Sequence, residues 1–246
     1  DLEDISFRTD GIMVVRIVSR HLPDPARQLA GRLHASPRLL QVSGIGGHSP
    51  QALINAAAGM IARGELDSVL VAGAEAYVQR ENNPGRVESA LFRGVPADYD
   101  GDDLAGATPL EKAHGIEHPM QGFPLFETAL WGASGLDLRS WLEKVGAMWS
   151  GFSRTAAQNP HAWSQVFRTP EEIVTSTADN RPIAFPYGKF MNSFVTVDQG
   201  AAVILMAEDV AEKHARKEKR RVYFLGGGYA EDSQQFLIEK SDFTAS

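Results

Sequence analysis

A short glycine-rich turn holds the residues best suited to chemistry. Gly44 to Ser49, GIGGHS, separates a run of aliphatic residues from an alanine-rich run that is typical of a helix. The first N–H groups of a helix have no partner within it, and the helix dipole adds positive potential there. Gly46 and Gly47 therefore offer amides that suit an anion or a developing oxyanion, but they supply no nucleophile.

Two side chains of this turn add further chemistry. The imidazole of His48 can act as a general acid, a general base or a hydrogen-bond donor to a carbonyl. The structural alternative is an imidazole satisfied by a backbone carbonyl. Ser49 precedes Pro50, a pairing typical of a helix N-terminus, so its hydroxyl is predicted to cap the helix rather than to act as a nucleophile.

The same turn allows a dinucleotide-binding interpretation. Its glycines come one residue short of G-x-G-x-x-G between a strand and a helix, and the next strand ends near Glu75, which could hold a ribose. Ser49 stands where that motif has its third glycine, which allows close packing of helix on strand. An NAD(P)-binding oxidoreductase remains an alternative.

Two other motifs suggest metals, but no metal site is predicted. His114, Glu117 and His118 match the H-x-x-E-H spacing of inverted zinc peptidases. Gly115 and Pro119 disfavour the single helix that this spacing requires. The aspartate-rich stretch 98–103 fails the spacing of an EF-hand and is expected to be a solvated loop.

Composition limits the classes of function. The chain has 246 residues, 43% of them hydrophobic, and no cysteine. It can bury a sizeable core, and it has neither a disulfide nor a thiolate nucleophile. The net charge of −7 argues against a general nucleic-acid binder. No apolar run reaches the roughly 20 residues that span a bilayer, and the acidic start lacks the apolar core of a signal peptide. A cytoplasmic protein without membrane or nucleic-acid partners is expected.

Around the turn, strands and helices are predicted to alternate. Three aliphatic segments are predicted as strands: residues 11–19, 38–43 and 68–72. Helices are predicted to begin at Pro25, with Asp24 as the cap, and at Ser49. The second helix is small or apolar nearly all round, which predicts enclosure on several sides, and Gly64 ends it. This order is typical of an α/β fold with a largely parallel sheet.

The rest of the chain is predicted to contain a long insertion. Residues 77–124 are rich in Gly, Pro and Asp and are predicted as an irregular segment. Further elements are then expected: helices over 125–133 and 136–158, an extended segment over 182–192, a buried strand over 197–206, a charged helix over 208–220 and a strand over 221–225. The second of these helices gathers apolar side chains on one face: Trp141, Val145, Met148, Trp149 and Phe152. This face is predicted as core, with the lining of an acyl or CoA channel as the alternative.

The turn and its flanking elements resemble the thiolase superfamily, in particular its acetyl-CoA acetyltransferase-like members. A typical thiolase has a strand, a Cys-Gly-Ser-Gly turn, an alanine-rich buried helix and a strand ending in Ala-Gly-Gly-x-Glu. The corresponding segments here are GGHS (46–49), ALINAAAGMIARG and VLVAGAEA. A second segment, MNSFVTVDQGAAVILMAED, resembles the family's Gly-Asn-Ala-Ser…Asp-Gly-Ala-Ala stretch with spacing one residue longer. Asn192 takes the position of the family's asparagine, and Gly200 that of its glycine.

The resemblance implies an α/β fold of the thiolase-like layered kind, in which a βαβαβ core carries a helical loop-domain insertion. It divides the chain into an N-terminal α/β domain, residues 1–80 and 180–246, and an inserted loop domain, residues 81–179. Thiolases consist of two similar halves, and the sequence is expected to represent the first. The family's His, its Asn-Glu-x-x-Phe element and its second cysteine belong to the other half.

Gly46 stands where the family has its nucleophilic cysteine. Glycine cannot form a thioester, so a mechanism through a cysteine acyl-enzyme is not expected. His48, which replaces a small residue of the family's turn, is a catalytic candidate by its own chemistry. For Asn192 the resemblance implies a catalytic role, orienting a water or the thioester oxygen. The alternative for Asn192 is ordinary turn chemistry before a strand. The remaining candidates are expected to bind substrate or to stabilise an oxyanion: Gly46, Gly47, Ser49 and Ser193.

The function that the resemblance implies is acyl-CoA chemistry in lipid metabolism. A CoA thioester would be the substrate of acyl transfer or of C–C bond formation or cleavage, and no cofactor is expected. A homodimer, or a heteromer with a related subunit or an OB-fold subunit, is the expected assembly. A non-catalytic subunit that binds CoA or a partner is the alternative from a different class.

Overall fold

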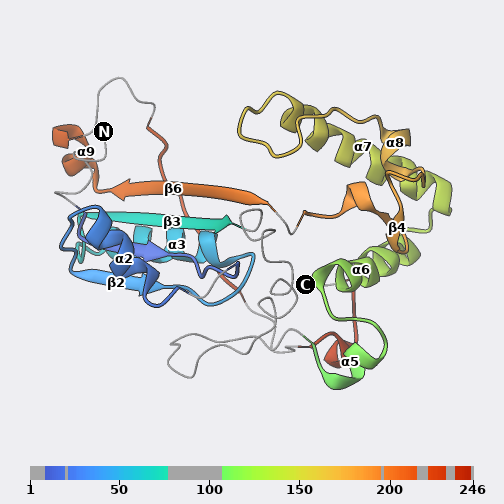
Figure 1. Ribbon diagram of the computed structural model, residues 1–246, viewed down its shortest axis with the longest axis horizontal. Coiled ribbons are helices and arrows are strands. Elements are labelled where there is room, and N and C mark those ends of the chain that lie inside the picture. Colours follow the sequence, from blue (N-terminus) through green and yellow to red (C-terminus); the bar gives the residue numbers. More distant parts are fainter. Residues whose placement is uncertain are drawn as a thin grey trace. The chain divides into compact units, whose positions relative to one another are not determined.

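The computed structural model describes residues 9–19, 22–76, 107–194, 197–214, 221–230 and 236–244. Contacts divide the chain into two compact units. The sheet unit comprises Asp1–Leu104 and Thr196–Ala230, and the helical unit comprises Ala105–Val195 and Glu231–Ser246. Figure 1 labels the elements of both. The aspartate-rich stretch 98–103 lies outside the described residues. The predicted division concerns where an inserted domain begins and ends, and it stays a prediction.

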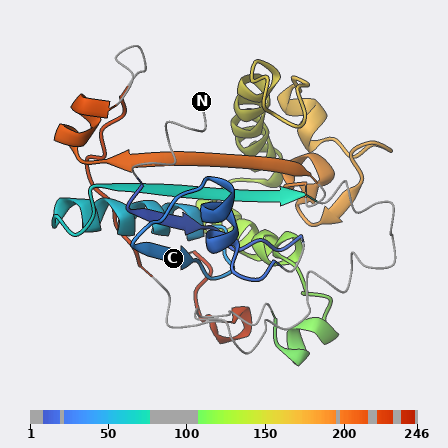
Figure 2. The ribbon, with the colours of Figure 1, turned by 60° about the vertical axis from the view of Figure 1, so that its left-hand side comes forward.

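The sheet unit contains a four-stranded sheet in the order β2-β1-β3-β6. Strands β1 (Gly11–Val14), β2 (Leu39–Val42) and β3 (Ser68–Ala76) are parallel, which confirms the predicted parallel arrangement. Strand β6 (Asp198–Met206) runs antiparallel to β3 along its whole length. Figure 2 shows these two long strands side by side.

Helices cover both faces of the sheet unit because alternate strand residues point to opposite sides. On one face α2 (Pro25–Arg32) packs its Ala26 and Ala30 against Ile12 and Val14. On the other face α3 (Ser49–Ala62) packs against the sheet through one buried cluster: Met13, Leu53, Ala57, Leu66, Val69 and Val71. The sheet is therefore the central layer of an α/β/α arrangement.

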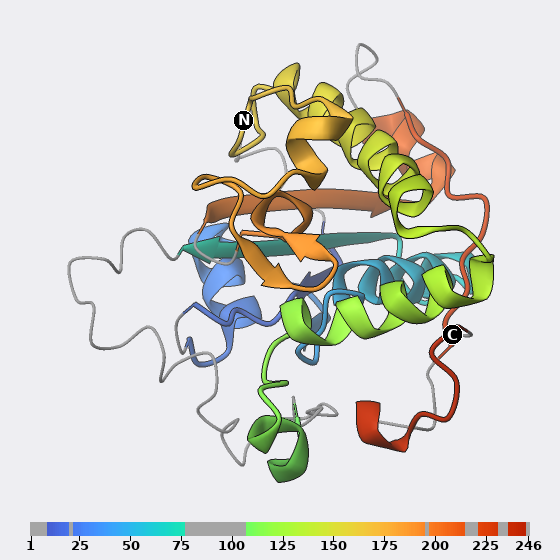
Figure 3. The same cartoon turned by 90° about the vertical axis from the view of Figure 1, so that its right-hand side faces the viewer.

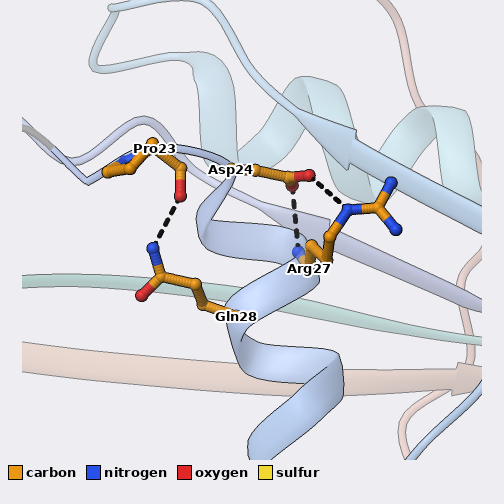
Figure 4. A network of polar contacts seen from close by, with 4 residues as sticks. All are labelled: Pro23, Asp24, Arg27 and Gln28. Atoms are coloured by element: carbon orange, nitrogen blue, oxygen red, sulfur yellow. Dashed lines mark hydrogen bonds and ion pairs between the residues drawn. The ribbon is translucent and has the colours of Figure 1, made fainter.

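The N-terminus of α2 is capped as predicted. Oδ1 of Asp24 accepts the N–H of Arg27 at 3.0 Å, and Oδ2 accepts Nε of the same residue at 2.7 Å (Figure 4). Nε2 of Gln28 donates to the carbonyl of Pro23 at 2.6 Å. The hydrogen bonds from Arg27, the backbone one first, lower the pKa of Asp24. This cap satisfies an N–H that the helix itself cannot pair.

Helix α3 has the predicted bounds but not the predicted enclosure. It ends at Ala62, and Gly64 follows with a left-handed φ of 69°. Only Ser49, Leu53 and Ala57 are buried in it. The expectation of a helix covered on several sides is wrong for the described residues, because they place the sheet on only one of its faces.

Two further expectations about the sheet unit are wrong. Strand β6 is apolar but exposed from Gly200 to Ile204, since no described helix covers it. Residues 221–225 form no strand with any described segment; they run extended and exposed, as the 95% exposure of Val222 and 97% of Leu225 indicate. The charged helix α9 (Glu208–His214) is described over the first half of its predicted span.

The helical unit is built mainly from α6 (Pro119–Ser134) and α7 (Leu138–Ala157) (Figure 3). Its smaller elements are α5 (Pro109–Ala113), α8 (Pro170–Val174), the hairpin strands β4 (Pro182–Ala184) and β5 (Tyr187–Gly188), and the 3₁₀ turns η3 (Lys189–Met191) and η4 (Leu237–Glu239). Helix α6 begins six residues before the predicted start at 125. Pro119 occupies its first turn, and the backbone N–H of His118 is satisfied by the Gln121 side chain.

The predicted apolar face of α7 is only half covered. Trp141 and Val145 are buried with Ile173 and Met191, and Trp149 packs against that cluster. Further along the same stripe, Met148 is 52% exposed and Phe152 is 59% exposed. The first half of this face is core, as predicted, and the second half is surface.

No helix in the described segments is both long enough and apolar enough to cross a membrane.

Candidate functional site

The glycine-rich turn joins β2 to α3 in the sheet unit. Ser43, just after β2, donates its N–H to the carbonyl of Val14 at 3.0 Å, which ties the start of the turn to β1. The turn closes where the N–H of Ser49 donates to the carbonyl of Gly46 at 3.1 Å. The turn is therefore held between the carboxyl ends of two parallel strands, where α/β folds commonly bind ligands.

Three amides of the turn have no partner among the residues that the structure describes. Within the described parts of the chain, the N–H groups of Gly46, Gly47 and His48 donate to no protein acceptor. They lie at the N-terminus of a 14-residue helix, where the helix dipole adds positive potential. Gly47 and His48 are exposed. These amides can therefore donate to a carbonyl oxygen from solvent or from a ligand.

Ser49 is engaged in the fold. Its side chain is 3% exposed, and its hydroxyl donates to the carbonyl of Gly44 at 2.9 Å. The N-cap residue is His48, and its side chain makes no capping hydrogen bond. The predicted capping role of Ser49 is thus wrong. Its hydroxyl instead satisfies a carbonyl of the turn, so it fixes the turn's shape.

The imidazole of His48 folds back over Gly46. A Cβ built on Gly46 would lie 2.5 Å from Cε1 and 2.7 Å from Nδ1 of His48. Both distances are far below ordinary carbon contact distances of about 3.5–4 Å. The ring therefore occupies space that any side chain at position 46 would need. At Gly47, by contrast, a Cβ would meet nothing within 4 Å.

A second aromatic ring borders His48, and the sequence did not predict it. The ring of Tyr229 lies 5.8 Å from the imidazole, centroid to centroid, at an interplanar angle of 47°. Tyr229 belongs to the extended segment 221–230, which contacts α3 through a hydrogen bond from Nδ2 of Asn55 to the carbonyl of Gly228, at 3.1 Å. The only sequence signal for this approach was the Gly226–Gly228 run.

Asn192 and Ser193 belong to the helical unit. Asn192 follows η3 and donates its Nδ2 to the carbonyl of Gly188 at 2.9 Å. Ser193 is exposed. The turn residues and Asn192 thus belong to different units, and their expected meeting in one site stays a prediction.

A buried asparagine holds the loop that carries Asn192. Asn180 is 1% exposed, and its Nδ2 donates to three carbonyls, of Glu172, Ile173 and Thr175, at 3.3, 2.8 and 2.9 Å. Its Oδ1 accepts the N–H of Phe190 at 2.9 Å. Asn180 therefore fastens the end of α8 to η3, and the sequence analysis did not single it out.

The helical unit also contains a half-buried carboxylate with two neutral donors. Oε1 of Glu127 accepts Nε1 of Trp141 at 2.7 Å, and Oε2 accepts the hydroxyl of Tyr187 at 2.9 Å. Burial, and then the hydrogen bond and charge of Glu127, raise the pKa of Tyr187 well above its ordinary value. Tyr187 therefore stays a proton donor to Glu127 throughout the neutral range, which fixes α6 against the hairpin.

The dinucleotide interpretation conflicts with the position of Glu75. Both of its carboxylate oxygens accept backbone N–H groups at 2.7 Å, from Val18 and Ser19. The hydroxyl of the fully buried Ser19 accepts the N–H of Ala76 in return. Glu75 thus ties the end of β3 to the segment that follows β1, and it does not present its carboxylate to a ribose.

The zinc-peptidase motif is divided between two helices. His114 follows α5 and places its Nδ1 2.9 Å from the carbonyl of Leu110, whereas His118 precedes α6. No group of three or more metal-binding side chains is found among the described residues. The structure gives no support to a zinc site in this motif.

The sheet unit, with its glycine turn before an alanine-rich helix, and the helical unit that interrupts it define a thiolase-like α/β protein. The chain has a thiolase-like fold. Its structure is similar to the crystal structure of a monomeric SCP2-thiolase like protein type 1 (STLP1) from Mycobacterium smegmatis, with a TM-score of 0.75 and 27% sequence identity. That similarity covers 100% of this chain and 46% of the other.

A second similar structure is the Ltp2-ChsH2(DUF35) aldolase, with a TM-score of 0.57 and 20% identity over 86% of this chain and 47% of that one. At this identity the likeness concerns the fold alone. The chain thus spans about half the length of both structures. No protein-family model matches the sequence, and neither does any curated protein.

Proposed function

We propose that this chain supplies the substrate-activating turn of an enzyme that acts on CoA thioesters without a cysteine acyl-enzyme. The reaction would be acyl transfer or the formation or cleavage of a C–C bond next to the thioester. Among these, cleavage of a β-hydroxyacyl thioester fits the turn best, because it needs an oxyanion site and a proton carrier but no nucleophile.

The observation that carries this proposal is the arrangement at Gly46. In a thiolase-like fold, the position of the nucleophile holds a residue without a side chain, and the imidazole of His48 lies over it. The neighbouring amides of Gly46 and Gly47 have no described protein acceptor. This arrangement supports an oxyanion site at the turn with a base beside it in place of a thiol.

The chemistry follows from these groups. The His48 imidazole takes the proton of the β-hydroxyl as the Cα–Cβ bond breaks and a carbonyl forms on the leaving fragment. The bond's electron pair moves to Cα and the thioester oxygen, whose developing negative charge the turn amides stabilise. The imidazolium then returns the proton to Cα, so that the products are an aldehyde or ketone and a shorter acyl-CoA. Asn192 is proposed to orient the thioester oxygen.

The mechanism is tested by measuring the turnover of β-hydroxyacyl-CoA by the wild-type protein and by the variant His48→Ala. We expect a loss of about 10²-fold or more in turnover, the usual contribution of a general base. His161→Ala, which changes an exposed histidine of the helical unit, is the control and should keep full activity. Intact-protein mass spectrometry should show no acyl adduct, and a stable adduct during turnover would contradict the mechanism.

A non-catalytic subunit is the second candidate. It is favoured by the engagement of two candidate side chains with their own backbone: Ser49 with Gly44 and Asn192 with Gly188. Titration calorimetry with acyl-CoA distinguishes the candidates, because binding without turnover in the wild type supports the subunit role.

A partner is part of both proposals. The name of the similar Ltp2-ChsH2(DUF35) aldolase joins two components. By analogy we propose that this chain works as a homodimer or with a related or OB-fold subunit, in cytoplasmic lipid metabolism. Light scattering of the purified protein, alone and after co-expression with its neighbouring genes, measures the assembly.

A further inference from the structure

We propose that Tyr229 is a positioning residue for His48, and that Asn55 holds Tyr229 in place. The inference deepens the proposed function, on which its kinetic test rests. It assigns a role to the extended segment 221–230, which belongs to no sheet of the described chain and which the mechanism above does not use.

Two contacts hold the imidazole of His48 in place. On one side the ring of His48 lies against the bare Cα of Gly46. On another side it meets the tilted ring of Tyr229, 5.8 Å away between centroids. Aromatic pairs at such distances and angles attract each other by about 0.5–1.5 kcal/mol beyond simple burial. No side-chain hydrogen bond orients the exposed imidazole among the described residues, so these two contacts define its position.

Asn55 of α3 holds the segment that carries Tyr229. The carbonyl of Gly228 accepts Nδ2 of Asn55 at 3.1 Å, and Oδ1 of Asn55 accepts Nε2 of Gln51 at 2.9 Å. A Cβ on Gly227 would lie 2.6 Å from Cγ of Asn55. A side chain at position 227 would have to displace the Asn55 amide, so glycine suits this close approach to α3. Asn55 lies in the second turn of α3, so this anchor brings the next residue, Tyr229, to the glycine-rich turn.

The position of the imidazole affects the rate of proton transfer. A base that is exposed and free to rotate spends much of its time away from the reacting proton, and misplacement by 1 Å can cost about 10²-fold in rate. A ring wall limits that rotation without forming a hydrogen bond that would compete for the imidazole nitrogens. Tyr229 therefore acts on His48 through its ring.

The matched variants are Tyr229→Ala and Tyr229→Phe, with Tyr223→Ala as the control. Tyr223 belongs to the same segment and is 61% exposed, close to the 60% of Tyr229. Its hydroxyl contacts Glu208 of α9. The full-length protein is used throughout. The ring resonances of His48 are assigned by comparison with His48→Gln and are followed by NMR.

We expect Tyr229→Ala to shift the His48 ring resonances and to lower turnover about tenfold with KM little changed. Tyr229→Phe should restore both, and Tyr223→Ala should change neither. Asn55→Ala should shift the His48 resonances in the same direction as Tyr229→Ala.

Unchanged His48 resonances in Tyr229→Ala would overturn the positioning role, and so would a Tyr229→Phe variant as impaired as Tyr229→Ala. The NMR result stands even where no thioester is turned over, so a failure of the proposed function is distinguishable from a failure of this inference.

Discussion

Replacing Gly46 with alanine tests whether the imidazole of His48 occupies the space beside this residue. The new Cβ would lie 2.5 Å from Cε1 of His48, and an ordinary contact needs about 3.5 Å, so the ring must move by about 1 Å. For a catalytic base, a displacement of this size costs about 10²-fold in rate. Gly46 does not have a positive φ, so alanine suits its backbone, and the free energy of unfolding should change by less than about 1 kcal/mol.

The assay is steady-state turnover of β-hydroxyacyl-CoA, with the thioesters separated by chromatography. Gly47→Ala is the neighbouring control, because its Cβ would enter open space, and it should lose less than about twofold. In a double-mutant cycle, Gly46→Ala should cost nothing further once His48→Ala is present, since both changes remove the same interaction. Equal losses in Gly46→Ala and Gly47→Ala, or additive losses in the cycle, would refute the reasoning.

Three further predictions concern the supports of the two units. Asn180→Ala should destabilise the protein by about 3 kcal/mol in urea unfolding, because it leaves three carbonyls and one N–H of a buried network without their partner. The lowered pKa of Asp24 means that its charge stabilises the fold at neutral pH, and that this contribution is lost as the pH falls from about 3.8 through the lowered pKa. Asparagine tolerates the φ of 44° at this position. Asp24→Asn should therefore reduce the fall in the free energy of unfolding at acid pH, and an unchanged fall would show that the Asp24 cap does not cause it. Because the pKa of Tyr187 is raised, ultraviolet titration should show one tyrosine ionising well after the ordinary value of 10.0, and Tyr187→Phe should remove that late step.

Much of the sheet unit could be predicted from the sequence, because its signals are local. Aliphatic runs mark β1, β2 and β3, the Asp24–Pro25 pair marks the start of α2, and Gly64 marks the end of α3. The parallel order follows from helices that connect successive strands. The resemblance to thiolases came from the same turn and helix together with the segment 191–209, and the structural comparison supports the thiolase-like fold.

The burial of β6 and of the 221–225 segment could not be predicted. Apolar composition shows that a strand is suited to being covered, but coverage depends on segments distant in the sequence. In β6, Val203 is 45% exposed despite apolar neighbours on both sides. The Val222 segment has strand-like composition, yet a strand exists only when another backbone pairs with it.

Within the candidate site, sequence reasoning found the turn and missed its surroundings. The role of Ser49 was mistaken because the serine–proline pair does not show which direction the hydroxyl faces. Tyr229 was missed because it lies 181 residues beyond His48 in the chain, and only the packing of Gly227 on Asn55 connects them. Contacts of this kind leave no periodic pattern.

The imidazole that lies over Gly46 also constrains how the turn can evolve. A side chain at position 46 and the imidazole in its present position claim the same volume, so a larger residue at 46 requires the His48 ring to move. Relatives that carry cysteine at the first position are expected to carry a small residue at the third, as the Cys-Gly-Ser-Gly turn does, and an aligned set of such turns should show the two positions exchanging together. If the proposed mechanism holds, this pair of positions would separate relatives that use a thiol from relatives that use an imidazole.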